Sequence, residues 1–135
     1  MGIYDKLVGN ATMGTDLKYI KDFVIDGEEI IASFQFIRDS IVLTNLGLYL
    51  VDVQGVTGKK IEVKFFPASK IKSVSFETAG NFDLDVDIKI GVDGNTVMAS
   101  SGAFYSAPIS FKVPKKQAEE AKEVIKLVKK HYLCK

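Results

Sequence analysis

The chain has 135 residues and a formal net charge of +1, so it has the size of one ordinary domain and lacks the broad basic surface that nucleic-acid binding needs. Hydrophobic residues make up 47% of the sequence and charged residues 26%, which is typical of a globular protein and excludes intrinsic disorder. Cys134 is the only cysteine, which excludes an internal disulfide and favours a reducing, cytoplasmic location.

Helical spacing dominates the first 26 residues. The apolar pattern predicts one short amphipathic turn over residues 2–9. A second helix should begin at Thr15 or Asp16, either of which can cap it, and should end before Gly27. Its apolar side is expected to consist of Leu17, Ile20, Phe23 and Val24. The opening "MGIYDKLVGN" has neither the positive leader nor the apolar stretch of a signal peptide, so we expect no export.

From residue 28 to residue 113 the period of the apolar pattern changes to two, which predicts seven strands. The cleanest alternation, "FDLDVDIKIGV" at 82–92, has apolar residues on one face and charged residues on the other. For residues 93–107 the pattern does not decide between a ragged strand and a loop. The other six strands are expected in "EIIASFQFI", "SIVLTN", "LYLVDV", "KIEVKFF", "IKSVSFET" and "APISFKV".

Turn chemistry separates these segments. Asn45 and Gly47 are expected to supply a positive φ between the second and third strands. Pro67 should end the fourth strand because it has no N–H to donate. Another turn is predicted at Asp93-Gly94.

Several apolar residues should point away from the main core. Phe65 and Phe66 are adjacent, so one of them should face outward. Ile31, Ile37 and Val42 are expected on the outer face as well. A partner chain or a second copy of this chain would then cover them.

A single amphipathic helix is predicted after Pro114, which suits the first helical position. Its apolar stripe is Ala118, Ala121, Val124, Ile125, Val128 and Tyr132. Antiparallel strands followed by one such helix predict a mainly β fold, a strongly bent sheet or open barrel that the helix closes. We expect a helical segment at 1–26 and the main domain at 27–135, together forming one globular unit.

Five short motifs, in order along nearly the whole chain, are similar to the stand-alone bacterial pleckstrin-homology (PH) domain family, a family of unknown function. They are "MGIYDKLVGNA", "GEEI", "FIRDSIVLTN", "VDVQGVTGKK" and "ETAGNFDLD". The resemblance implies a PH-like barrel of two nearly orthogonal antiparallel sheets, capped by the C-terminal helix, and it implies cyclic homo-oligomers. The chain departs from the family pattern at Leu46-Gly47, where relatives carry a basic pair, at Ala68, where an aromatic residue is expected, and in the longer segment 93–107.

The lipid site of eukaryotic relatives does not carry across with the resemblance. Those proteins hold phosphoinositides with several basic residues around the loop joining the first two strands. Here that loop is Arg38-Asp39-Ser40, which is short and neutral. Lys59, Lys60 and Lys64 remain a candidate anion patch, but Asp39, Asp52 and Glu62 lie close in sequence or on neighbouring hairpins and would weaken it, so a solvated hairpin end is the favoured interpretation.

Catalysis, cofactors and metals are not expected. His131 is the only histidine, and neither it nor Cys134 lies in a recognisable catalytic motif. Asp83, Asp85 and Asp87 project from one face at about 7 Å spacing, which is too wide for all three to ligate one Ca²⁺. We therefore expect no enzyme, no cofactor and no metal.

The favoured hypothesis is a non-catalytic module that forms a cyclic homo-oligomer and binds a protein partner. The candidate interaction rim is Arg38, Asp39, Gln54, Lys59 and Lys60. The alternative is a peripheral module that binds anionic lipid or a membrane surface through Lys59, Lys60 and Lys64. We expect no nucleic-acid partner.

Overall fold

The structure is a computed structural model that describes residues 17–37, 39–54, 60–78 and 85–134. The predicted helical turn at 2–9 and the predicted helix start at Thr15 or Asp16 lie outside these residues. The chain divides into two compact units between Ala68 and Ser69, and each unit has its own sheet.

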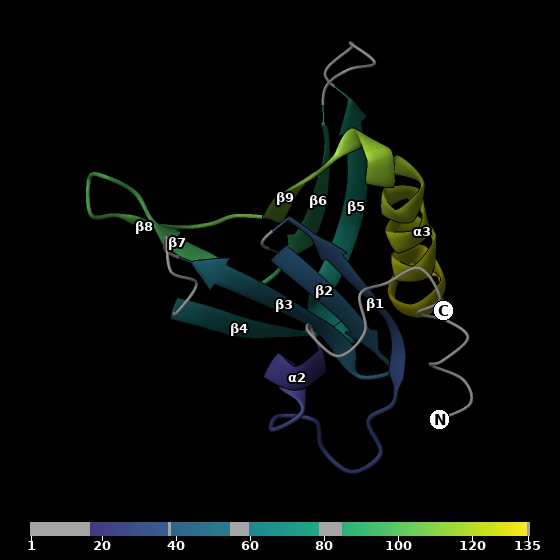
Figure 1. Ribbon diagram of the computed structural model, residues 1–135. Helices are drawn as coiled ribbons and strands as arrows, with labels where there is room; N and C mark the ends of the chain where they lie inside the picture. The colour runs from purple at the N-terminus through teal and green to yellow at the C-terminus, as the bar shows by residue number, and fades with distance from the viewer. Residues whose placement is uncertain (1–16, 38, 55–59, 79–84, 135) are drawn as a thin grey trace. The chain divides into compact units, whose positions relative to one another are not determined.

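The first unit contains a four-stranded antiparallel sheet (Figure 1). The strands lie side by side in chain order: β1 (Ile30–Phe36), β2 (Asp39–Thr44), β3 (Gly47–Gln54) and β4 (Lys60–Pro67). A short helix, α2 (Leu17–Ile20), precedes them. The first four predicted strands are confirmed, and Pro67 is the last residue of β4, as expected.

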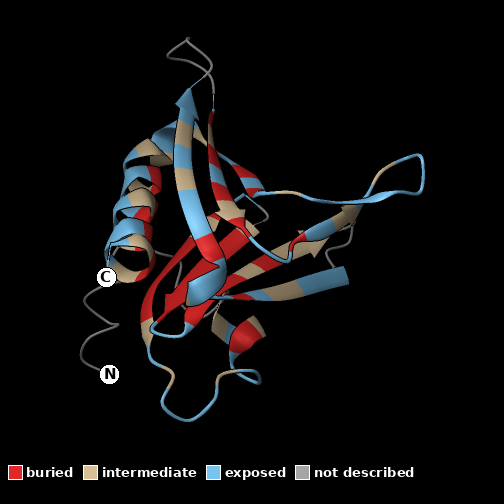
Figure 2. Ribbon diagram, turned by 180° about the vertical axis from the view of Figure 1, so that it is seen from behind, coloured by how far each residue is buried: buried red, intermediate tan, exposed pale blue. Residues whose placement is uncertain are grey.

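One face of this sheet is the core face that the sequence predicts. Ala32 pairs with Leu43, Leu43 with Leu48, and Leu48 with Phe66. These four apolar side chains form a row across all four strands. All four are buried (Figure 2). Burying such a row stabilises the fold by about 25 cal/mol per Å² of apolar surface removed from water.

The opposite face is also buried, which corrects one expectation. Val42 is fully buried rather than outward-facing, because Ile20 of α2 packs with Val42, Tyr49 and Val51. Ile31 is only 9% exposed. The chain's own N-terminal segment therefore covers Val42, which was expected to need a partner, whereas Ile37, at 61% exposed, does face outward.

Phe23 was expected on the apolar side of a helix, but it lies beyond the end of the described helix. The described helix ends at Ile20, and the chain turns there, with the Phe23 N–H donating to the Ile20 carbonyl at 2.8 Å. Phe23 is 57% exposed as a result, while Val24 packs against the Ile20 cluster.

The turn between β2 and β3 works differently from the prediction. Neither Asn45 nor Gly47 has a positive φ. Instead the Thr44 hydroxyl oxygen accepts hydrogen bonds from the backbone N–H groups of Leu46 (3.2 Å) and Gly47 (3.3 Å). Glycine is needed at 47 for close approach, since a Cβ there would clash with the Phe66 carbonyl oxygen and the Phe65 ring.

The second unit contains a three-stranded antiparallel sheet in the order β5-β6-β9 and a separate two-stranded hairpin. The sheet strands are β5 (Ile71–Thr78), β6 (Val86–Val92) and β9 (Ile109–Val113), which match the remaining three predictions. The open segment 93–107 is a hairpin of β7 (Thr96–Met98) and β8 (Phe104–Ser106), and it extends away from the three-stranded sheet (Figure 1). Gly94 has φ +95°, so the predicted turn there does use a positive φ.

The C-terminal helix α3 (Ala118–Val128) packs against β5 within this unit. A 3₁₀ turn (Lys115–Gln117) leads into it after Pro114, and a π-helical turn (Lys129–Leu133) follows it. The predicted stripe supplies its buried residues, namely Ala121, Val124, Val128 and Tyr132. They lie in the same unit as buried Val86, Ile88 and Ile90 of β6.

We expect Gly47→Ala to destabilise the protein by about 1–3 kcal/mol, because the added methyl group meets backbone that the β3–β4 pairing holds in place. Urea denaturation followed by circular dichroism measures this change. Ser75→Ala is the control, since Ser75 is an exposed strand position in the other sheet and its substitution strains no backbone. A Gly47→Ala protein as stable as the wild type would contradict the close approach.

Candidate functional site

A pocket of about 450 Å³ opens on the face of the first sheet that α2 partly covers. Val63, Phe65 and Pro67 line it from alternate positions of β4, which places them on one face of the strand. Tyr49 is the cross-strand partner of Phe65, and their ring centroids are 4.8 Å apart at an interplanar angle of 54°. The turn after α2 and the β2–β3 turn complete the lining with Phe23, Ile25, Glu28 and Leu46.

The pocket combines an apolar rim with a polar floor. The rim residues Phe23, Ile25, Leu46 and Phe65 are 57%, 62%, 38% and 40% exposed. Tyr49, by contrast, is only 3% exposed. The four rim residues are large hydrophobic side chains in contact with solvent at a concave site, which is the usual character of a binding site.

Glu28 organises the floor of the pocket. Its Oε2 accepts a hydrogen bond from the Thr44 hydroxyl at 2.7 Å. Its Oε1 accepts from the Tyr49 hydroxyl at 3.1 Å and from the Ile25 N–H at 3.2 Å. Burial, followed by the hydrogen bond to Glu28 and its negative charge, raises the pKa of Tyr49 to about 12. Tyr49 therefore stays protonated and remains a donor to the carboxylate at physiological pH.

Asn45 fixes the wall of the pocket to the β2–β3 turn. Its Oδ1 accepts from the Glu29 N–H at 2.7 Å, and its Nδ2 donates to the Gly27 carbonyl at 3.0 Å. The Asn45 N–H in turn donates to the Glu29 carbonyl at 3.1 Å. Three hydrogen bonds from one residue hold the backbone around Glu28, so the pocket is shaped before any ligand arrives.

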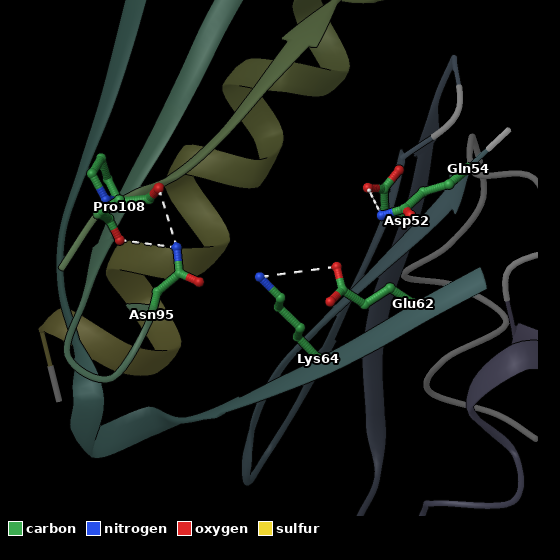
Figure 3. Close-up of polar contacts among 7 residues, drawn as sticks. Asp52, Gln54, Glu62, Lys64, Asn95 and Pro108 are labelled. Atoms are coloured by element: carbon green, nitrogen blue, oxygen red, sulfur yellow. Dashed lines mark hydrogen bonds and ion pairs between the residues drawn. The ribbon is translucent and has the colours of Figure 1, made fainter. Parts of the chain in front are cut away.

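The predicted interaction rim is only partly described. Arg38 and Lys59 lie outside the described residues. Gln54 and Lys60 are cross-strand partners at one end of the β3–β4 ladder. The Gln54 Nε2 donates to Asp52 Oδ2 at 3.0 Å (Figure 3).

The candidate anion patch contains a carboxylate between its described lysines. Lys60, Glu62 and Lys64 alternate along β4 and so share one face of the strand. The Lys64 ammonium lies 4.0 Å from a Glu62 carboxylate oxygen, as the dashed line in Figure 3 marks. The positive charge of Lys64 is therefore partly neutralised within the protein.

Three carboxylates form a row across the first sheet at this end. Asp39 pairs with Asp52, and Asp52 pairs with Glu62, on neighbouring strands. Asp39 is partly buried beside Phe36, its partner on β1. Burial, together with the hydrogen bond to Asp52 and that residue's negative charge, raises the pKa of Asp39 to about 6. This end of the sheet is thus acidic and sensitive to pH.

Sequence reasoning missed the pocket. "GEEI" and Leu46-Gly47 were singled out as points of likeness to, and departure from, a family, yet neither was assigned to a site. The missing information was the pairing of Tyr49 with Phe65 and the turn that brings Glu28 back over β2 and β3. A Glu followed 21 residues later by a Tyr in a strand carries no local signal for that contact.

A second exposed apolar surface lies in the other unit. The β7–β8 hairpin is coloured mostly as exposed in Figure 2. Its Met98, Phe104 and Tyr105 are 64%, 70% and 53% exposed. Asn95, which is only 8% exposed, anchors the base of the hairpin: its Nδ2 donates to the carbonyls of Ala107 (2.9 Å) and Pro108 (3.4 Å) (Figure 3). The hairpin base is fixed while its apolar tip contacts solvent.

Within the described ranges, no group of three or more His, Cys, Asp or Glu side chains is arranged to hold a metal ion. Asp83 lies outside those ranges, and Asp87 pairs with Lys112 at 3.3 Å. None of the described helices is long and apolar enough to cross a bilayer.

We expect stability to fall as pH rises from about 4 to about 6, because protonated Asp39 is favoured in the folded protein and its ionisation is penalised there. Asp39→Asn should remove this penalty and gain on the order of 1 kcal/mol above pH 6, after allowance for solvent screening. Urea midpoints of both proteins between pH 4 and pH 7.5 give the difference.

Asp85→Asn, the same substitution at an exposed position, serves as the control for losing one carboxylate. A stability difference between wild type and Asp39→Asn that stayed constant over this pH range would contradict the raised pKa.

Comparison with known proteins identifies the family. The family model described as "Bacterial PH domain" matches residues 2–131. The uncharacterized protein YjqA of Bacillus subtilis is 43% identical over 107 residues, which cover 77% of this chain and 86% of that protein.

Two solved structures have a similar fold. The crystal structure of a pleckstrin homology domain from Shewanella amazonensis matches with a TM-score of 0.69 and 27% identity, covering 97% of this chain and 98% of that one. A DUF1696 family protein with a pleckstrin-homology domain from Shewanella loihica matches with a TM-score of 0.61 and 28% identity, covering 87% and 95%. With its antiparallel sheets and C-terminal helix, the chain has a PH-like fold and belongs to the bacterial PH domain family.

Proposed function

We propose that this chain is a non-catalytic PH-like binding module that assembles into a cyclic homo-oligomer and presents a surface to a protein partner. The observation that carries the proposal is the placement of its exposed hydrophobic side chains. Four of them, Phe23, Ile25, Leu46 and Phe65, line one pocket. Three more, Met98, Phe104 and Tyr105, lie together on one hairpin.

The hairpin suits contact between copies. Residues 95–107, "NTVMASSGAFYSA", contain no charged side chain, so no ionic group has to lose its hydration when the hairpin is covered. A contact between the hairpin of one copy and a different surface of the next copy is heterologous. Repeated contacts of that type generate a closed ring when the rotation between copies closes.

A protein partner is favoured over an anionic lipid by the charges at the end of the first sheet. Lys60 and Lys64 face the same way as Glu62, and Asp39 and Asp52 continue the acidic row. An acidic membrane would repel these carboxylates while it attracted the lysines. We place the protein in the cytoplasm on the strength of its single cysteine, Cys134, which is exposed.

Static light scattering on the purified protein between 1 and 100 µM should give a molar mass that is a small multiple of 14.8 kDa. Phe104→Asp should shift the mass toward that of one chain, since it places a charge on the contact surface without altering the core. Ser110→Asp is the control, because Ser110 is exposed on β9 and lies on neither apolar surface. A wild-type monomer throughout the concentration range would overturn the oligomer.

Sedimentation with acidic phosphatidylserine-containing liposomes separates the partner classes. We expect no more than weak binding at low salt and none at 0.15 M salt, because an electrostatic contact of two or three lysines is screened. Lys60→Glu with Lys64→Glu should leave the result at 0.15 M salt unchanged. Co-sedimentation that persisted at 0.15 M salt and was lost in this double variant would show that the partner is a membrane surface and not a protein.

A further inference from the structure

We propose that the pocket of the first unit binds the ammonium head of a lysine side chain, free or methylated, on a partner protein. The inference rests on the proposed protein-binding function and names what that site recognises. Three features of the pocket carry it: an uncompensated carboxylate, aromatic walls beside that carboxylate, and apolar walls that fit an alkyl stem.

The carboxylate of Glu28 has only neutral partners. The hydrogen bonds that it accepts come from the hydroxyls of Thr44 and Tyr49 and from the Ile25 N–H. Glu28 forms no ion pair with any residue in the described part of the chain. Covering a charge of this kind is costly unless an opposite charge arrives with the cover, so a cationic ligand is favoured over a neutral or anionic one.

The chain around Glu28 strengthens the preference for a cation. Residues 22–29, "DFVIDGEE", supply three of the pocket's lining residues. They contain four carboxylates, Asp22, Asp26, Glu28 and Glu29, and no basic residue. Lys21 directly precedes the segment, which leaves a local excess of negative charge beside the pocket that attracts cations.

Aromatic rings stand beside the carboxylate. Phe23, Tyr49 and Phe65 all line the pocket, and the Tyr49 and Phe65 rings are inclined to each other by 54°. The Tyr49 and Phe65 rings pack on each other, so the exposed rings of Phe23 and Phe65 are the ones whose π faces are available to an ammonium group, free or methylated. Ring faces together with a carboxylate form a site that a free anion or a phosphate would not enter.

The remaining walls suit the stem of a lysine. Ile25, Leu46, Val63 and Pro67 are apolar and line the same pocket. They can cover the four methylene groups while the charged end reaches Glu28. An apolar side chain from the hairpin of a second copy would fit these walls too, but it would cover Glu28 without supplying a charge.

The experiment is a titration of the full chain, labelled on aromatic and methyl groups and observed by NMR. The probes are Nα-acetyl-lysine methylamide, its Nε-trimethyl form and its neutral Nε-acetyl form. We expect the two charged probes to shift the resonances of Tyr49, Phe65 and Val63 with millimolar dissociation constants. The neutral probe should bind at least about tenfold more weakly.

Two variants test the assignment. Glu28→Gln keeps the side-chain length and an acceptor oxygen but removes the charge, and it should weaken the charged probes about tenfold. Phe65→Leu should weaken the trimethyl probe by a similar factor. Glu62→Gln is the matched control, because Glu62 lies on the same sheet but outside the pocket, and it should bind the probes as the wild type does.

The outcomes decide between occupants. Equal binding of the charged and neutral probes, or unchanged binding by Glu28→Gln, would show a merely apolar pocket and overturn the inference in favour of a second copy. No shifts at 50 mM of any probe would overturn it as well. Light scattering on the same samples reports the oligomer independently, so loss of lysine binding and loss of self-association are read separately.

Discussion

The hydrogen bonds to one carboxylate shape the pocket of the first unit. Glu28 connects the turn after α2 to Thr44 of β2 and to Tyr49 of β3, and it does so with both oxygens. The segment carrying Phe23 and Ile25 is also fixed to the sheet by Asn45, by the bond between the Tyr49 hydroxyl and the Phe23 carbonyl, and by packing of Val24. The pocket is therefore shaped by a charged group that serves as a structural link, and in the proposed lysine site the same carboxylate is the group that a cation would meet.

A second consequence of this arrangement is a sheet with two buried faces. Antiparallel sheets often leave one face to water, and their strands then alternate between apolar and polar residues. Here burial in β1 and β2 does not alternate, since ten of their thirteen residues are buried, including the consecutive apolar residues Ile41, Val42 and Leu43. Cover from Ile20 of α2 explains the apolar residues that a one-sided sheet would not contain.

The elements that could be predicted from the sequence are those governed by local pattern. The seven main strands and the C-terminal helix follow from alternation of period two, from a stripe at helical spacing, and from Pro67 and Pro114 at their boundaries. The β7–β8 hairpin could not be assigned from the sequence, because its three-residue strands are too short for alternation to be recognised. The outward position of Val42 was mispredicted because the N-terminal cover is a contact between distant parts of the chain. The pocket could not be predicted for the same reason, because it depends on the strand register that pairs Tyr49 with Phe65.

The hydrogen bonds of Asn95 have a consequence for how such proteins diverge. They close the hairpin at its root, so the ladder between β6 and β9 does not depend on what lies beyond Val97. Mutation can then lengthen or shorten the tip, or replace its side chains with other hydrophobic or charged ones, while the scaffold stays intact. In such an architecture the residues that stabilise the fold are separate from the residues that would contact other proteins, so new contacts can evolve without a cost to folding.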